Sequence, residues 1–152
     1  MITVSDGVSS GTREDESGEA LQTLLSDAGF EVRRVVVPDE IPAIETAIQE
    51  SVDVSNLIVT TGGTGFGPRD VTPEATAQVL EREAPGLIHM MLARGLGTTA
   101  MAGLSRGRAG SIGSTLVINV PGSARGAVEG LEAVLEVIPH ALDLLSGDTE
   151  HR

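Results

Sequence analysis

The chain contains no cysteine, tryptophan or tyrosine, and all ten of its basic residues are arginine. Without cysteine it can form neither a disulfide nor a thiolate metal site, and it has no thiolate nucleophile. Without lysine it has neither the lysine of a Walker-type phosphate loop nor the amine of a Schiff-base mechanism. Any phosphate that the protein binds must therefore be held by backbone N–H groups, hydroxyl groups, arginine or a metal ion.

Basic residues are scarce relative to acidic ones. Ten arginines stand against 22 aspartates and glutamates, which gives a net charge of −12. Nucleic-acid-binding proteins need a basic surface, so we expect a small-molecule partner and no nucleic acid. No apolar run is long enough to span a bilayer, and Met1–Val4 does not begin a signal-like segment. We therefore expect a cytoplasmic protein without a membrane partner.

The length predicts one domain. With 152 residues, of which 40% are hydrophobic, the chain can bury one sizeable core. We expect a single domain over residues 1–147, followed by a polar tail over residues 148–152. The three histidines, at positions 89, 140 and 151, are too scattered to indicate a zinc site.

Apolar periodicity predicts strands and helices in alternation. We expect strands at 1–5, 30–37, 57–59 and 115–120, the second of them buried inside a parallel sheet. We expect segments 8–17 and 107–113 to be loops. Helices are predicted from Ser17 to Gly29, from near Pro42 to Val52, and over 72–83, 87–96 and 123–147, with Ser17, Thr72 and Ser123 as N-caps and a kink at Pro139.

This alternation indicates a three-layer α/β/α fold with a mostly parallel sheet. In such a fold, ligands bind beyond the carboxyl ends of the strands. The loops that begin at Ser5, Pro38, Thr61 and Pro121 all follow predicted strands. We therefore expect these four loops to lie at one edge of the sheet.

The richest of these loops is residues 62–71, GGTGFGPRDV, which we call the glycine loop. It follows an apolar strand and precedes Thr72-Pro73, which is favourable chemistry for a helix start. Glycine permits positive φ and close approach to a ligand, and a helix N-terminus offers unpaired N–H groups. The loop therefore predicts a phosphate site. Arg69 could meet an anion there, and Asp70 could hold a metal or a proton.

Other candidate residues have two readings. Ser5 and Asp6 either cap the end of a strand or face a ligand. Asp39 and Glu40 fit a polar turn better than a site. Ser105 and Arg106 precede a glycine-rich segment and suit an anion pocket better than a mobile surface loop. The apolar block in the helix expected at 87–96 fits core packing or, less well, a subunit interface.

The motifs together identify a resemblance. TTGGTGFGPRDVTPEAT at 60–76, with VSDGVSSGTREDESG and PDE upstream and LSRGRAG and STLVINVPGS downstream, resembles the molybdopterin adenylyltransferases and their MogA/MoaB-like relatives. The motifs stand in the family's order over nearly the whole chain. The resemblance implies the MogA/MoaB-like fold and transfer of AMP from Mg-ATP to the terminal phosphate of molybdopterin, with release of pyrophosphate. Because members of this family are typically trimers, it also implies a homotrimer, with other molybdenum cofactor biosynthesis proteins as possible partners.

The resemblance also implies roles for individual residues. Asp39 and Asp70 would be catalytic and would hold Mg²⁺. With so few aromatic residues, the adenine would be held by backbone and aliphatic contacts, with Phe66 as the one exception. Nucleotide and phosphate contacts would come from Ser5, Asp6, Gly62, Gly63, Thr64, Gly65, Arg69, Thr72 and Glu74. Pterin contacts would come from Ser105, Arg106, Pro121, Gly122 and Ser123.

Two alternatives remain open at this point. The first is a relative that binds molybdopterin and oligomerises without transferring AMP. The second is a nonenzymatic nucleotide-binding or assembly module that uses the same loop. The presence of both Asp39 and Asp70 favours the enzyme.

Overall fold

A computed structural model describes residues 1–148 as a six-stranded sheet with the strand order β2-β1-β3-β6-β5-β4. The first four strands in this order are parallel, and β5 and β4 are antiparallel to their neighbours. The strands are β1 (Ile2–Val4), β2 (Val35–Val37), β3 (Leu57–Thr61), β4 (Arg82–Glu83), β5 (Ala109–Ile112) and β6 (Thr115–Val120). The helices are α1 (Asp6–Ser9), α2 (Glu16–Asp27), α3 (Ile41–Val52), α4 (Thr72–Val79), α5 (Pro85–Leu96), the 3₁₀ helix η1 (Ala100–Leu104), α6 (Ala124–Leu135) and α7 (Ile138–Ser146).

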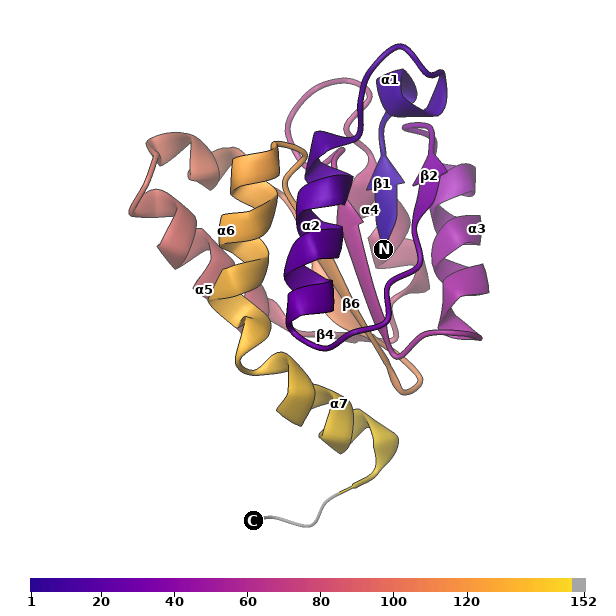
Figure 1. The fold of residues 1–152 in the computed structure, drawn as a ribbon, viewed down its shortest axis with the longest axis vertical. Helices are drawn as coiled ribbons and strands as arrows, with labels where there is room; N and C mark the ends of the chain where they lie inside the picture. The colour runs from indigo at the N-terminus through magenta and orange to yellow at the C-terminus, as the bar shows by residue number, and fades with distance from the viewer. Residues whose placement is uncertain (149–152) are drawn as a thin grey trace.

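Helices cover both faces of the sheet, so the predicted three-layer fold is confirmed (Figure 1). Alternate residues of a strand point to opposite faces, and β6 shows this directly. Leu116, Ile118 and Val120 enter a core with α2, α6 and α7. Val117 enters the second core, with α3 and α4. This two-sided burial explains why the central strands, apart from Asn119 in β6, consist of apolar or β-branched residues.

A buried asparagine ties the centre of the sheet to the loop that precedes β5. The Asn119 side-chain amide donates to the hydroxyls of Thr60 (2.8 Å) and Thr76 (3.1 Å), while its carbonyl oxygen accepts from the N–H of Arg108 (2.9 Å). Asn119, Thr60 and Thr76 are fully buried. A buried amide is tolerated only when its donors and acceptor are paired, so this network fixes β3, α4 and β6 in register.

Two predictions about strands are wrong. The segment 30–37 forms a strand only at Val35–Val37, and β2 lies at the sheet edge with Val35 41% and Val36 40% exposed. The β-branched residues there indicated a strand correctly, but composition does not distinguish an edge from an interior position. The expected loop at 107–113 contains β5, which pairs with β6 through a turn at Gly113, where φ is +54°.

Several helix ends also differ from prediction. Asp15, not Ser17, caps α2 by accepting from the N–H of Gly18 at 2.9 Å. Val71 occupies the N-cap position of α4, so Thr72 lies inside the helix. That helix ends at Val79, after which β4 replaces the predicted last turn. The segment 8–17 is not all loop, because the one-turn helix α1 extends to Ser9.

The C-terminal third is also divided differently. Helix α5 begins at Pro85, before the predicted start at 87, and no residue of α5 is fully buried. The predicted single helix from Ser123 is two helices, with Pro139 in the first turn of α7. Helix α7 ends at Gly147, with φ +86°, as expected. Of the predicted tail, 149–152 lie outside the described residues. Over residues 1–148, none of the helices has both the length and the apolar character that crossing a membrane requires.

Candidate functional site

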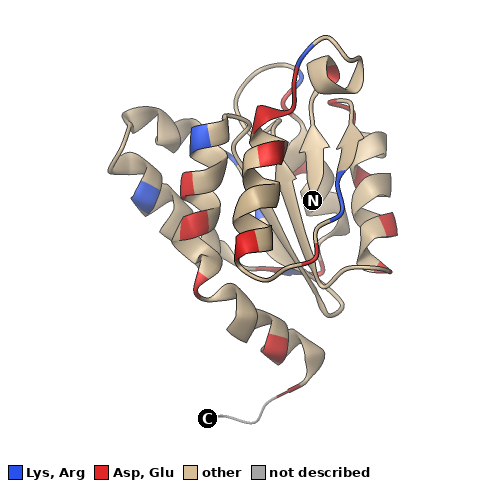
Figure 2. Cartoon of the chain, viewed as in Figure 1, with Lys and Arg blue, Asp and Glu red and all other residues tan. Residues whose placement is uncertain are grey.

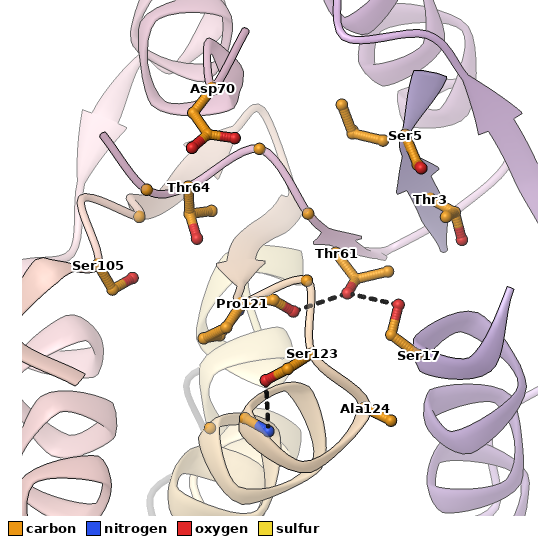
Figure 3. Close-up of a pocket in the computed structure, with 18 of the residues that line it drawn as sticks. Thr3, Ser5, Ser17, Thr61, Thr64, Asp70, Ser105, Pro121, Ser123 and Ala124 are labelled. Carbon is orange, nitrogen blue, oxygen red and sulfur yellow. Dashed lines mark hydrogen bonds between the residues drawn. The ribbon is translucent and has the colours of Figure 1, made fainter. Parts of the chain in front are cut away.

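The main cavity lies where the parallel strands end, as the order of strands predicts. Its volume is about 700 Å³. Loops that follow β1, β2, β3 and β6 all contribute to its lining. Figure 3 labels residues from three of these loops, among them Ser5, Thr64 and Ser123. Of the predicted site residues, the lining includes Ser5, Asp39, Gly62, Gly63, Thr64, Gly65, Asp70, Ser105, Pro121, Gly122 and Ser123.

The glycine loop begins with a backbone crossing that only glycine permits. Gly62 has φ +100°, and a Cβ there would lie 2.2 Å from the carbonyl oxygen of Val4. Gly63 has φ +66°, and a Cβ there would lie 2.4 Å from the hydroxyl of Thr72. That hydroxyl donates to the carbonyl of Gly62 at 2.9 Å, so Thr72 serves the loop from inside α4. The two glycines allow the chain to leave β3 directly across the end of β1.

The glycine loop presents unpaired backbone donors to the cavity. Within residues 1–148, the N–H groups of Gly63, Thr64 and Gly65 donate to no protein acceptor. All three residues line the cavity. Successive N–H groups in a turn form a concavity that binds anions, so the loop can hold a phosphate without lysine.

Two helices begin at the opposite wall. The hydroxyl of Ser123 accepts from the N–H of Gly126 at 3.1 Å and caps α6, as predicted. Between α6 and α2, the Thr61 hydroxyl lies 2.8 Å from the carbonyl oxygen of Pro121 and 3.1 Å from the hydroxyl of Ser17 (Figure 3). Ser17 is therefore a buried link between α2 and β3, which explains why it does not cap the helix.

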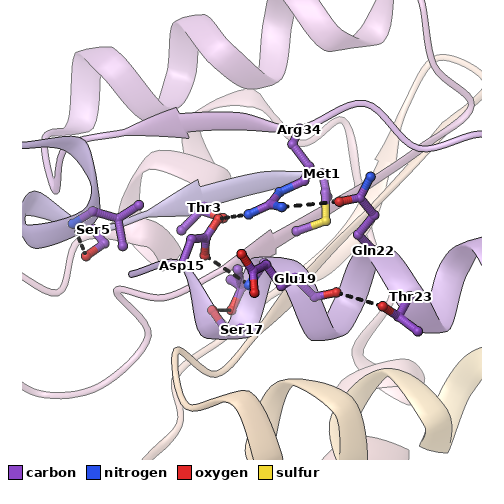
Figure 4. A network of polar contacts seen from close by, with 12 residues as sticks. Met1, Thr3, Ser5, Asp15, Ser17, Glu19, Gln22, Thr23 and Arg34 are labelled. Carbon is purple, nitrogen blue, oxygen red and sulfur yellow. Dashed lines mark hydrogen bonds and ion pairs between the residues drawn. The ribbon is translucent and has the colours of Figure 1, made fainter. Parts of the chain in front are cut away.

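Asp15 organises this wall, and sequence reasoning did not single it out. Its carboxylate accepts from the hydroxyl of Thr3 (2.8 Å), from the guanidinium of Arg34 (2.6 Å) and from the N–H of Gly18 (Figure 4). A Cβ at Gly18 would lie 2.1 Å from this carboxylate, so a larger residue there would displace the Asp15 side chain from its capping position. The signal in the sequence was Asp15 three residues before Gly18, a spacing typical of an N-cap.

Asp39 is held by a reciprocal contact with Asp6. The N–H of Asp6 donates to Asp39 Oδ2 (2.7 Å), and the N–H of Asp39 donates to Asp6 Oδ1 (3.0 Å). Arg69 binds both carboxylate oxygens of Asp6, at 3.0 and 3.1 Å, and this contact lowers the pKa of Asp6. Burial raises the pKa of Asp39, and the nearby charges of Asp6 and Asp70 act in the same direction. The surroundings of Asp39 therefore disfavour its negative charge, and an added cation would offset this effect.

Asp70 is the second carboxylate on the cavity. Its Oδ2 accepts from the N–H of Gly67 at 2.8 Å and lies against Gly65, while Asp39 Oδ1 lies against Gly63. In the described part of the chain, no three acidic or histidine side chains stand together as a metal site. Mg²⁺ commonly takes one or two carboxylates from the protein and the remaining ligands from phosphate and water. Asp39 and Asp70 fit such a shared cation.

Five predicted contacts do not line the cavity. Asp6 and Arg69 bind each other, Thr72 binds the loop backbone, and Arg106 and Glu74 form an ion pair. Phe66 is 72% exposed and also lies outside the lining. A wall that sequence reasoning missed is apolar instead, with Ile88, Met91, Leu92, Met101 and Leu104 from α5 and η1. Nothing in their spacing separated these residues from core positions.

The charge distribution agrees with a small ligand. Acidic side chains are spread over the outer helices, and in this view no face gathers basic residues (Figure 2). Each of Arg34, Arg69, Arg106 and Arg108 is paired with a carboxylate. These four side chains are thus neutralised by carboxylates, whereas a compact anion can reach the N–H groups of the glycine loop.

Comparison with known proteins agrees with the motifs. A family model described as "Probable molybdopterin binding domain" matches residues 1–140. The chain is 39% identical to the molybdopterin adenylyltransferase of Helicobacter pylori strain J99, over 97% of this chain and 87% of that protein. It is 40% identical to the molybdenum cofactor synthesis protein cinnamon of Drosophila melanogaster, over 97% of this chain but only 25% of that longer protein. The crystal structure of MoaB from Thermus thermophilus matches with a TM-score of 0.90 at 50% identity, covering 96% and 94% of the two chains.

The raised pKa of Asp39 predicts a stability cost at neutral pH. The pKa of Asp39 is higher in the folded state than in the unfolded state. The free energy of unfolding therefore falls as the pH rises through the folded-state pKa, because the folded protein then carries the unfavourable charge. Asp39→Asn keeps an oxygen for the N–H of Asp6 and removes the charge. The variant should therefore unfold at a higher temperature than wild type at pH 7, and this difference should vanish below the ordinary carboxyl pKa. Exposed Glu31→Gln, in the loop before β2, controls for net charge, and an equal gain in that control would contradict the prediction.

Proposed function

Because the chain belongs to the molybdopterin-binding domain family of molybdenum cofactor biosynthesis, we propose that it is a molybdopterin adenylyltransferase. It transfers AMP from ATP to the terminal phosphate of molybdopterin and releases pyrophosphate. One observation carries this proposal: Gly63, Thr64 and Gly65, whose N–H groups have no protein acceptor within residues 1–148, line the same cavity as Asp39 and Asp70. Backbone donors together with a carboxylate pair suit a metal-bound polyphosphate.

The reaction needs alignment more than a protein nucleophile. An oxygen of the molybdopterin phosphate attacks the α-phosphorus of ATP, and the bond from that phosphorus to the bridging oxygen of the β-phosphate breaks. The protein must place the two phosphates in line and stabilise the charge on the α-phosphate. We assign this task to the N–H groups of the glycine loop, with Ser5 beside them. When bound, Mg²⁺ would be held by Asp39 and Asp70 and would neutralise phosphate charge.

We assign the pterin to the part of the cavity that is not assigned to the nucleotide. Ser105 and the segment Pro121–Ser123 line the cavity together with the apolar wall of α5 and η1. We assign the pterin to this side, with Ser105 as a polar contact. Asp6, Arg69, Thr72 and Glu74 then act behind the cavity, where their observed bonds hold the loops that contact the nucleotide.

We also propose a homotrimer. Helix α5 has no fully buried residue, although it is apolar, and Met90 is 40% and Leu96 51% exposed. Such a face on an isolated chain favours burial against another copy. Because Ile88 and Met91 of the same helix line the cavity, association would also stiffen its apolar wall.

The proposal is tested directly by AMP transfer from Mg-ATP to molybdopterin. Asp70→Asn should lower turnover by about 100-fold or more, because it removes charge from a site that organises the transferring phosphate. The fold should survive, since an amide oxygen can still accept from the N–H of Gly67. Asp53→Asn is the matched control and should behave as wild type. Molybdopterin binding by wild type without any AMP transfer would instead indicate a binding-only relative.

Binding of ATP should depend on Mg²⁺ through Asp39. In the presence of Mg²⁺, Asp39→Asn should weaken ATP binding about tenfold, since a metal ligand is lost. In EDTA the same variant should bind ATP as well as wild type or slightly better, because only repulsion between carboxylate and phosphate has been removed. Calorimetric titration under both conditions makes the comparison. Equal weakening in both would mean that Asp39 acts as a hydrogen-bond partner only.

The trimer is tested by sedimentation velocity. Wild type should sediment as a trimer at micromolar concentration, and Leu96→Glu should dissociate it because the substitution places a charge in an apolar interface. Val54→Glu, at a residue that is 60% exposed on another part of the surface, should leave the trimer intact. A monomeric wild type would refute the assignment.

A further inference from the structure

Arg106 makes an unusual set of contacts for a residue expected to bind a substrate. Its Nε donates to the carbonyl of Gly65 (2.8 Å), its Nη2 donates to the carbonyl of Asp70 (2.8 Å), and its Nη1 pairs with the carboxylate of Glu74. Its own N–H donates to the carbonyl of Thr64 at 2.8 Å. The guanidinium thus reaches from the middle of the glycine loop to the first turn of α4.

Within residues 1–148, Arg106 makes the only hydrogen bonds to the middle of the glycine loop. Gly62 donates to Val120, Thr72 donates to Gly63, and Asp70 and Gly67 bond each other, so both ends of the loop are fixed. Between them, the backbone of residues 64–66 makes no hydrogen bond in the described structure except to Arg106. These residues include two of the three N–H groups that face the cavity.

The contacts suit arginine and no other cation. The planar guanidinium offers five N–H donors in a fixed fork, so it can bind two carbonyls and a carboxylate at once. An ammonium group is a compact point charge and cannot span these acceptors. The guanidinium also lies over the ring of Phe66, at 5.4 Å from its centroid, which accounts for an aromatic side chain that is otherwise exposed.

We propose that Arg106 is a positioning residue, which holds the middle of the glycine loop in the conformation that binds the transferring phosphate. Its role in catalysis rests on the adenylyltransferase function proposed above. Arg106 does not line the cavity, and its side chain is only 28% exposed. It therefore acts through the N–H groups of Thr64 and Gly65 and through Asp70, and it does not contact the pterin.

The loop itself can be observed without any substrate. The chain has no tryptophan or tyrosine, so Phe66→Trp provides a single fluorophore under the guanidinium. In this background, Arg106→Ala should increase the fast component of the fluorescence anisotropy decay, which reports local motion. Arg106→Lys should do the same. Arg108→Ala is the matched control, since Arg108 pairs with Glu83 at 2.6 Å and does not touch the loop, and it should leave the decay unchanged.

Kinetics then separates positioning from direct binding. With the wild-type residue at position 66, Arg106→Ala should lower kcat by about 10- to 100-fold, as expected for misaligned reacting groups, with the KM for molybdopterin changed less than about threefold. Arg106→Lys should not restore kcat, because it cannot form the fork. If Arg106 contacted the substrate phosphate directly, Arg106→Ala would instead raise the KM for molybdopterin. Arg106→Lys, which keeps the positive charge, would then have a KM close to that of wild type. That second pattern would overturn the proposal.

The two proposals fail in distinguishable ways. If wild type transfers no AMP, the adenylyltransferase assignment is wrong. The anisotropy comparison still tests whether Arg106 orders the glycine loop, because it needs no substrate. If AMP transfer is present and Arg106→Ala leaves both the decay and kcat unchanged, the positioning role is wrong. Should Arg106→Ala fail to fold, Arg106→Lys, which keeps the charge, takes its place in both measurements.

Discussion

The close approach of Gly62 to the end of β1 is the constraint on which the site depends. With a Cβ position only 2.2 Å from the carbonyl of Val4, no other residue lets the chain leave β3 along this path. The path brings Gly63, Thr64 and Gly65 over the carboxyl edge of the sheet, between the loops of β1 and β6. From that position the backbone N–H groups can bind an anion, so the proposed phosphate binding needs no lysine.

The loops around the cavity are held by one another more than by the sheet. Asp39 and Asp6 exchange backbone contacts, Arg69 joins Asp6 to the glycine loop, and Arg106 joins that loop to the segment before β5. Most of the arginines near the site form ion pairs or hydrogen bonds with these loops and do not line the cavity. The carboxylates of Asp39 and Asp70 line the cavity, and burial and neighbouring negative charge raise the pKa of Asp39. An added cation would offset this unfavourable charge.

The sequence predicted the fold and the loops around the cavity better than it predicted the ends of the local elements. It identified the three-layer fold and the loops after β1, β2, β3 and β6, because the apolar strands and the glycine, proline and serine residues after them are local signals. It placed helix ends less well. Ser17 looked like a cap and is a buried link to Thr61, while Thr72 bonds the carbonyl of Gly62 from inside α4. Which partner a hydroxyl takes depends on what packs against it.

The sequence by itself determined the chemistry available to this protein: no lysine and no thiol, a glycine-rich turn after a strand, and carboxylates at Asp39 and Asp70. These properties are fixed by residue type and local order. Only the tertiary structure decided which groups face the ligand. It turned Arg69 and Arg106 away from the cavity toward loop partners, made β2 an edge strand and placed the apolar α5 beside the cavity. The reason is that side-chain direction and exposure depend on contacts between residues far apart in the chain.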